Sequence, residues 1–572
     1  MHLRHGLVAL LLTTAALSQQ PAQQPQLPID TYIHQSWDRL QRSMLDCSSF
    51  PDTKVPATTT TTTKAPTHPL TAPILYLPEE QKLTPELRAL QQHCNVQILH
   101  LPRRIKTLGD IDPSQLPNPG LLYLPNPYVV PGGRFNEMYG WDSYFILLGE
   151  LADNRVALAR GTVENFFYEI DHYGAVLNAN RTYYLTRSQP PFLSSMVLEV
   201  YNAELPTDPK AAHEFLHESL PYLIRDHNLW ITQPHLDLTT GLSRYFDLDD
   251  GPVPEMGDDN TYYTTVIHWL LAHPSDANAT YLEPFPACIT TTCKQPSTDG
   301  RVLSPSFYQG DRAMRESGFD TSFRFGPFSG STQDFAPVDL NALLYKYERD
   351  IAFIHATLGD SSNAIIWSST AGDRLNTINS LMWDDTSGLY YDYNLRTHQR
   401  STYHYVTTYY ALWAGIASQA KAARMVANLP LFSRPGGLTM STFTSGEQWD
   451  QPYGWAPTNW LVTVGLIRYG YNGDALSIAR HFTNTVAINY AHDGTIREKY
   501  NVVDSSANVA VAAGYKENVI GFGWTNGVYS GMQQLLHDPK LLNAPQQPPA
   551  PSQQPPFPQP AQPPASPPSQ NQ

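Results

Sequence analysis

The feature that most constrains this fold is a helical spacing of apolar residues that recurs from about residue 160 to 490. One stripe starts after Asp339, an N-cap candidate, and stops at Gly359; its members are Leu340, Leu344, Tyr347, Ile351, Ile354 and Leu358. A second stripe, which ends near Gly174, consists of Val163, Phe166, Phe167 and Ile170. Further helices are expected at 369–383, 409–427, 457–470 and 474–489, and a short hairpin around Gly388 at 383–393.

Between these helices no regular β-α-β alternation is evident, which argues against a parallel-sheet barrel. Paired helices over about 450 residues instead favour an all-α solenoid closed on itself. The periodicity predicts the helices, but it does not by itself establish that the ring closes.

Three segments have compositions that cannot build a packed core. Residues 19–28 are rich in Gln and Pro, residues 53–73 hold a run of threonines among prolines, and residues 544–572 consist almost wholly of Pro, Gln, Ser and Ala. We therefore expect an extension with a Thr/Pro-rich linker at 19–72, one catalytic domain at 73–540 and a tail at 541–572.

The first 18 residues have the pattern of a secretory signal peptide. Basic and histidine residues precede an apolar run from Leu7 to Leu17, and small residues follow at 16–18. This run is too short to span a bilayer comfortably, and no later stretch is long and apolar enough to do so. The sequence thus predicts secretion to the extracellular space, with the cell wall or a vacuole as other destinations.

Four cysteines fit an oxidising compartment, and the simplest pairing joins Cys47 to Cys94 and Cys288 to Cys293, although the count leaves the connectivity open. Their spacings match no zinc pattern. Two glycosylation sequons begin at Asn180 and Asn278, and the second is the better candidate because the first lies inside a polar motif.

Charge narrows the classes of ligand. The net charge is −15, so the surface repels phosphate backbones and anionic lipids, which disfavours nucleic acid and membrane docking. The 33 Tyr and 11 Trp include rings that can stack on sugar faces, although such rings also fill ordinary cores.

Five loops carry more Arg, Asn, Gln, Asp, Glu and Trp than a helical core needs. In the first, Gly132 and Gly133 allow a loop to follow a ligand closely. The loops are PGGRFNEMYGWDSY (131–144), LNANRTYYLTRSQPP (177–191), DRAMRESGFDTSFR (311–324), QWDQPYGWAP (448–457) and the pair REKYN (497–501) with GFGWTNG (521–527).

In order and approximate spacing, these motifs resemble the conserved blocks of the trehalase family of glycoside hydrolases, over about residues 115–530. The third block and LNALLYKYE are closest to fungal-type members. The resemblance implies an (α/α)₆ toroid with a sugar site in its mouth, and hydrolysis of trehalose to two glucose molecules with inversion at the anomeric carbon. It implies no cofactor and no metal.

The family's residue roles carry over motif by motif. The general acid falls on Asp320 and the general base on Glu498. The sugar-binding positions fall on Arg134, Trp141, Asp142, Asn178, Arg187, Ser188, Gln189, Glu255, Arg315 and Gly318. Taken alone, each of these residues has a structural interpretation, as a cap, an ion pair or a core side chain, and Trp449 and Trp455 are either core or site walls.

The chemistry explains why two carboxyl groups are needed. An inverting enzyme protonates the leaving oxygen with one carboxyl and activates water with the other, about 6.5–9.5 Å away. Asp320 must then keep its proton, and Glu316 and Asp142 are the expected like-charged neighbours that raise its pKa. Arg134, Arg187 and Arg315 would hold hydroxyls and offset the buried carboxylates.

Two departures from the family pattern limit the transfer. Many relatives have Arg where this chain has Val253, so one sugar contact is expected to be missing. The glycine-rich lid of bacterial and animal members is replaced by residues 505–517, and Glu517 is not assigned its role.

Two rival functions remain open at this stage. One is an inverting glucosidase on the same ring, such as a glucoamylase-like exo-hydrolase. The other is a secreted sugar-binding protein without activity, against which the intact pair Asp320 and Glu498 argues. The oligomeric state cannot be inferred from the sequence.

Overall fold

A computed structural model describes residues 27–54, 72–256, 261–275, 279–284, 300–513 and 517–542. The proposed signal peptide, the Cys288–Cys293 pair and the Asn278 sequon lie outside these residues. Among the described residues, no helix combines the length and the apolar character that a membrane crossing needs.

Six helices of the described residues form a closed inner ring in which each contacts the next, and the last contacts the first. In ring order they are α3 (Gly140–Ala152), α5 (Leu193–Glu204), α10 (Val338–Thr357), α12 (Tyr410–Ala414), α14 (Ala456–Arg468) and α16 (Gly523–His537). The closure that periodicity alone could not establish is therefore present.

An outer layer packs around this ring. Helices α4 (Val156–His172), α6 (Pro209–Trp230), α11 (Ser361–Leu381) and α15 (Asn472–Asp493) each contact one or two inner helices, and α1 (Ile29–Leu40) contacts α16. Helix α13 (Gln419–Ala427) follows α12 and packs against a short hairpin. The arrangement is the predicted (α/α)₆ toroid.

Burial separates the two layers. Seventeen of the 20 residues of α10 are buried, whereas only four of the 21 residues of α11 are. A helix that is enclosed on every side needs apolar or paired residues all round, and a helix on the outside needs only one apolar stripe. The apolar stripe from Leu340 to Leu358 therefore corresponds to the inner helix α10.

Several helix boundaries differ from the prediction: α11 begins at Ser361, eight residues before the predicted start, and two other differences have an identifiable cause. Asp339 does not cap α10, because the helix begins at Val338 and the Asp339 carboxylate pairs with Arg324. The stretch 409–427 is split into α12 and α13 by Gly415, which has φ +82° and ends the first helix in a left-handed turn.

A small parallel sheet was not anticipated. Strand β2 (Ile74–Leu77) pairs in parallel with both β3 (Gln97–His100) and β4 (Leu121–Leu122), and α2 (Pro85–His93) connects the first two strands. The four residues of β2 are all buried, so this strand lacks the alternation that would have marked it.

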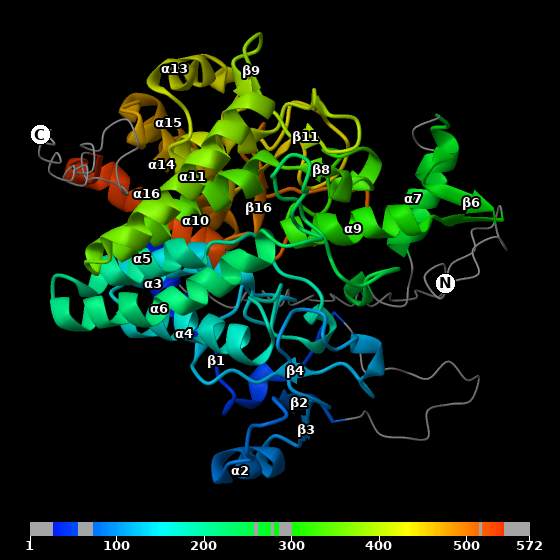
Figure 1. Cartoon of the computed structure of the whole chain (residues 1–572), viewed down its shortest axis with the longest axis vertical. Coiled ribbons are helices and arrows are strands. Elements are labelled where there is room, and N and C mark those ends of the chain that lie inside the picture. The colour runs from blue at the N-terminus through cyan, green and yellow to red at the C-terminus, as the bar shows by residue number, and fades with distance from the viewer. Residues whose placement is uncertain are drawn as a thin grey trace, which may run out of the picture.

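The remaining strands are short and antiparallel. The predicted hairpin around Gly388 is formed by β9 (Trp383–Asp384) and β10 (Leu389–Tyr390). The others are β1 (Gln41–Arg42) with β5 (Tyr128–Val129), β6 (Leu282–Pro284) with β7 (Arg301–Leu303), β8 (Phe335–Ala336) with β11 (Tyr393–Asn394) and β12 (Gln399–Arg400), β13 (Ser433–Arg434) with β14 (Gly437–Leu438), and β15 (Tyr453–Trp455) with β16 (Lys499–Asn501). Helices α7 (Thr261–Ala272) and α9 (Pro305–Ser317) lie beside β6, away from α13 and α15 (Figure 1).

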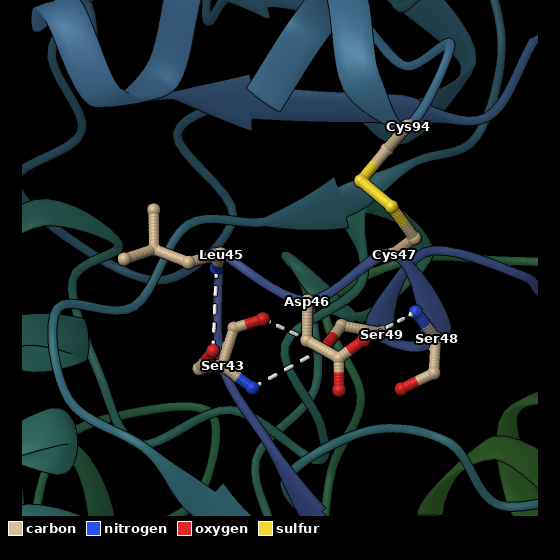
Figure 2. Close-up of a disulfide and its surroundings, with 7 residues drawn as sticks. All are labelled: Ser43, Leu45, Asp46, Cys47, Ser48, Ser49 and Cys94. Atoms are coloured by element: carbon tan, nitrogen blue, oxygen red, sulfur yellow. Dashed lines mark hydrogen bonds between the residues drawn. A yellow bond between two sulfur atoms is a disulfide. The ribbon is translucent and has the colours of Figure 1, made fainter. Parts of the chain in front are cut away.

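The N-terminal residues are fastened to the toroid. The Trp37 side chain of α1 is fully buried, and β1 pairs with β5. The Cys47–Cys94 disulfide, which the sequence predicted, joins this segment to the end of α2 (Figure 2).

Candidate active site

A cavity of about 700 Å³, including its open mouth, lies where the N-terminal ends of α3 and α16 meet the polar loops. It gathers side chains from positions 54 to 524, which only ring closure can bring together. Its lining residues are Lys54, Arg134, Phe135, Tyr139, Trp141, Asp142, Asn178, Tyr184, Arg187, Gln189, Glu255, Met256, Arg315, Gly318, Asp320, Trp449, Trp455, Glu498, Phe522 and Trp524.

Eleven of the twelve predicted site residues are in this lining. The exception is Ser188, whose backbone N–H donates to Glu316 and whose hydroxyl donates to the Val176 carbonyl. Ser188 is buried and supports the loop between Asn178 and Gln189.

Asp320 follows the C-terminal end of α9, and its backbone is held by hydrogen bonds from the Gln448–Asp450 motif. The Gln448 amide donates to the Asp320 carbonyl, and the Trp449 N–H donates to the Thr321 carbonyl at 3.0 Å. Glu447 and Asp450 continue the clamp by accepting from the Thr321 hydroxyl and the Phe323 N–H. Consecutive residues of one loop thus hold the segment that carries Asp320.

Burial raises the pKa of Asp320 to about 7, against the lowering effects of Arg315 and Arg187. The side chain keeps 32% of its surface exposed, and this surface faces the cavity that the residue lines. Glu255 also raises this pKa. Glu316, expected to be a neighbour, instead accepts hydrogen bonds from Phe246 N–H and Ser188 N–H and pairs with His235.

Glu498 precedes β16 and is buried against a cation. The Lys499 ammonium donates to Glu498 Oε2 at 2.6 Å and lies 5.0 Å from the centre of the Trp455 ring. The Glu498 carbonyl accepts from the indole N–H of Trp524 at 3.2 Å. A charge-assisted hydrogen bond of this kind stabilises an ionised carboxylate.

Asp142 connects the two carboxyl groups electrostatically. It lies in the first turn of α3, and its pKa is raised well above the usual range by burial first and then by the negative charges of Glu498 and Asp320. All three carboxyl groups line one cavity, and Asp142 lies close enough to the other two for their charges to raise its pKa.

Two arginines place positive charge on the other walls. Arg187 pairs with Glu255 and lies 3.6 Å from Asp247, and Arg315 is held by both carboxylate oxygens of Asp311. These acidic partners fix the guanidinium groups, so that the cations are oriented before any ligand binds.

Aromatic rings build a rigid wall. Trp449 and Trp455 stack at 3.8 Å, and Trp141 lies against Trp449, with ring centres 5.8 Å apart. The two interpretations of Trp449 and Trp455 are thus both valid, because each ring is buried and lines the cavity. Gly318, at φ +75°, allows this packing: a Cβ there would lie 2.8 Å from the Trp141 ring.

Polar side chains of the second motif support the first. Gln189 Oε1 accepts from the Trp141 N–H at 2.9 Å, which satisfies a free donor at the start of α3. Asn178 donates to the Ser188 carbonyl at 3.4 Å. Arg134 is half-buried, with its guanidinium 5.9 Å from the centre of the Phe135 ring.

Several lining residues were missed from the sequence. Phe135, Tyr139, Tyr184, Phe522 and Trp524 lie within or beside the motifs, so their place in the same strings could have identified them. Lys54 could not have been found in this way, because it belongs to a segment that composition assigns to a linker.

The departures from the family pattern have structural counterparts. Val253 is buried, and its N–H donates to the Tyr263 hydroxyl at 2.9 Å. In the segment that replaces the lid, Ala512 N–H donates to the Gly446 carbonyl, and the Tyr453 hydroxyl donates to the Ala510 carbonyl.

The first glycosylation sequon is buried. Asn180 is fully buried, and its side chain accepts from Met138 N–H, so this sequon is not accessible to a glycan.

Comparison with known proteins agrees with this geometry. The family model described as "Trehalase" matches residues 18–536. A probable trehalase of Eremothecium gossypii is 34% identical over 92% of this chain and 74% of its own length. The solved structure of neutral trehalase Nth1 from Saccharomyces cerevisiae has a TM-score of 0.72 and 32% identity, and the match covers 90% of this chain and 95% of that one.

The same comparisons correct the predicted location. Six relatives, from organisms that include Kluyveromyces lactis, Neurospora crassa and Saccharomyces cerevisiae, are named cytosolic neutral trehalase, which contradicts the expectation of secretion. This chain spans 55–64% of the length of those relatives.

The closed helical ring, the shared cavity and the matches over nearly the whole chain lead to one assignment. The chain belongs to the trehalase family of glycoside hydrolases.

Proposed function

We propose that this protein hydrolyses α,α-trehalose to two glucose molecules with inversion, using Asp320 as general acid and Glu498 as general base. The observation that carries the proposal is the pair of unlike carboxyl groups on one cavity: Asp320, with a pKa raised to about 7, and Glu498, paired with Lys499. A buried carboxyl whose pKa is raised in this way can hold its proton for the leaving oxygen, as a general acid must.

The reaction uses one water molecule. Asp320 gives its proton to the bridging oxygen as the bond from that oxygen to the anomeric carbon breaks. Glu498 takes a proton from the water that attacks this carbon from the opposite face. The glucose that leaves keeps its α configuration, and the attacked glucose becomes β. Proton exchange with solvent then restores both carboxyl groups.

The rest of the cavity would hold the two sugar rings. Arg187 and Arg315 are fixed by Glu255 and Asp311, so their N–H groups can donate to hydroxyl oxygens without reorganising. Asp142, whose pKa burial raises well above its usual range, lines the same cavity and can hydrogen-bond a sugar hydroxyl. The stacked Trp449 and Trp455 exclude water from one side.

The stereochemical course gives the sharpest test. Proton NMR of early product from trehalose should show equal amounts of α- and β-glucose before mutarotation. A product that is all α would indicate retention and would overturn the mechanism. Glucose release from starch and not from trehalose would overturn the substrate.

Two variants test the assigned roles. Asp320→Asn and Glu498→Gln should each lose at least about a hundredfold in kcat while keeping the circular dichroism spectrum of the wild type, since proton transfer contributes on this order. Glu218→Gln is the matched control, because Glu218 is an exposed carboxylate on the outer helix α6 and does not line the cavity. A near-wild-type rate in either acidic variant would show that the role is misassigned.

A further inference from the structure

The segment Arg42–Lys54, here called the N-terminal arm, is fastened to the two loops that carry Arg134 and Arg187. Its carbonyls at Ser48 and Pro51 accept from Asn136 and Arg181, both at 2.9 Å. These contacts join the arm to the first two polar motifs, residues 131–144 and 177–191.

The last residues of the arm continue this attachment. Asp52 accepts from the Tyr183 hydroxyl at 2.9 Å, and the Thr53 hydroxyl donates to the Arg134 carbonyl at 2.6 Å. The arm therefore reaches the cavity wall at its final residue, Lys54.

The middle of the arm is cross-linked as well. The disulfide from Cys47 to Cys94 ties it to the end of α2, and local hydrogen bonds close a compact turn around it (Figure 2). In this turn the Ser49 hydroxyl donates to the Ser43 carbonyl, and the Ser48 N–H donates to Asp46. The arm is thus preorganised rather than loosely laid on the surface.

Lys54 itself is 5% exposed and lines the cavity. Its ammonium pairs with the buried Glu137 and lies 5.9 Å and 5.8 Å from the centres of the Phe135 and Tyr139 rings, which also line the cavity. An ammonium carries three N–H donors, and the hydrogen bond to Glu137 occupies one of them.

Glu137 has other hydrogen-bond donors besides Lys54. Arg181 already donates to Glu137 at 2.9 Å, and the Tyr139 hydroxyl donates at 3.2 Å. Asp52 attracts both Lys54 and Arg181, so two carboxylates balance the two cations; a sugar hydroxyl would instead supply an acceptor for the remaining N–H donors of the buried Lys54 ammonium.

We propose that Lys54 is a sugar-binding residue: the N-terminal arm places its ammonium in the cavity wall, where it donates a hydrogen bond to a glucose hydroxyl of the substrate. This inference rests on the proposed function, since it names a further contact in the same site. It also makes the arm a part of the active site rather than an extension.

The test compares Lys54→Met with the double variant Lys54→Met/Glu137→Gln, in the full chain with trehalose as substrate. Lys54→Met removes the ammonium and keeps the stem, and the double variant also removes the charge that it neutralises. If Lys54 binds sugar, KM should rise about tenfold or more in both variants, as for loss of a charged hydrogen bond, with a smaller change in kcat.

A KM within twofold of wild type in Lys54→Met, or a return to the wild-type KM in the double variant, would overturn the proposal. If Lys54→Met does not fold, the KM of the double variant decides: a tenfold rise supports the proposal, and a wild-type value overturns it. Trehalose binding, followed by the fluorescence of the cavity tryptophans, separates this outcome from failure of the proposed function. A wild type that binds trehalose without cleaving it would refute the reaction, while weaker binding in the variants would still support Lys54.

Discussion

Arg315 Nη1 lies 3.6 Å from Asp320 Oδ2, so the proposed general acid faces a fixed cation. Two effects oppose each other at this carboxyl: burial raises its pKa to about 7, and Arg315 is the largest lowering influence. These opposing effects hold the pKa of Asp320 near neutrality, and a proton donor is most effective when its pKa is close to the working pH.

The first prediction is a pH profile. Because Asp320 must be protonated, kcat/KM should fall as pH rises through about 7, with a slope of one proton. Arg315→Gln should move this alkaline limb to higher pH, since it removes the lowering influence, while also weakening substrate binding. An unchanged limb in this variant would show that another group controls it.

Stability should depend on pH through the same carboxyl. Its folded pKa of about 7 exceeds the ordinary value of 3.8, so between these values the folded state holds a proton that the unfolded state has lost. The contribution of Asp320 to stability is therefore lost as pH rises from about 4 to 7.

Asp320→Asn should then be more stable than wild type at pH 8, with a difference that shrinks towards pH 4. Thermal unfolding at both pH values measures it, and a pH-independent difference would contradict the shifted pKa. Glu150 and Asp226 have pKa values raised to about 8 and about 7, so they also make the fold less stable as pH rises. This effect is the same in wild type and in Asp320→Asn, so it cancels when the two are compared.

The sequence predicted the helices and most of the cavity for identifiable reasons. Inner helices such as α10 have long periodic stripes, and the site residues lie in polar strings that a helical core does not require. Asp320 and Glu498 were selected by their motifs, and the structure places both on one cavity.

What the sequence could not provide is contact between distant segments. Nothing local to Glu316 shows that it points towards Phe246 rather than Asp320, because the loop that binds it lies about 70 residues away. Lys54 follows the same logic: its neighbours have the composition of a linker, and only the partners Glu137 and Arg134 make the arm part of the wall.

A third prediction concerns the disulfide. Replacing Cys47 and Cys94 by Ser should free the arm, lowering the melting temperature and raising KM for trehalose, with kcat less affected. Loss of a native disulfide commonly costs about 2–4 kcal/mol. Wild type treated with reductant should behave like the double serine variant, and the variant itself should not respond to reductant. A KM equal to wild type would show that the arm stays in place without its cross-link.

The final prediction tests the clamp on the general acid. Glu447 is buried, its pKa is raised to about 7 by burial, and it accepts from the hydroxyl of Thr321, the residue after Asp320. Glu447→Leu removes this acceptor and leaves the Thr321 hydroxyl unpaired, so the loop should loosen and kcat should fall by about tenfold, with little change in KM.

Glu447→Gln is the matched control, because its amide oxygen can still accept from Thr321 while the negative charge is gone. If Glu447 acts by positioning the loop, Gln should restore kcat to within about threefold of wild type and leave the alkaline limb of the pH profile unmoved. If it acts instead through its charge, Gln should be as slow as Leu, and the limb should shift. The two outcomes separate a geometric role from an electrostatic one at a residue that does not line the cavity.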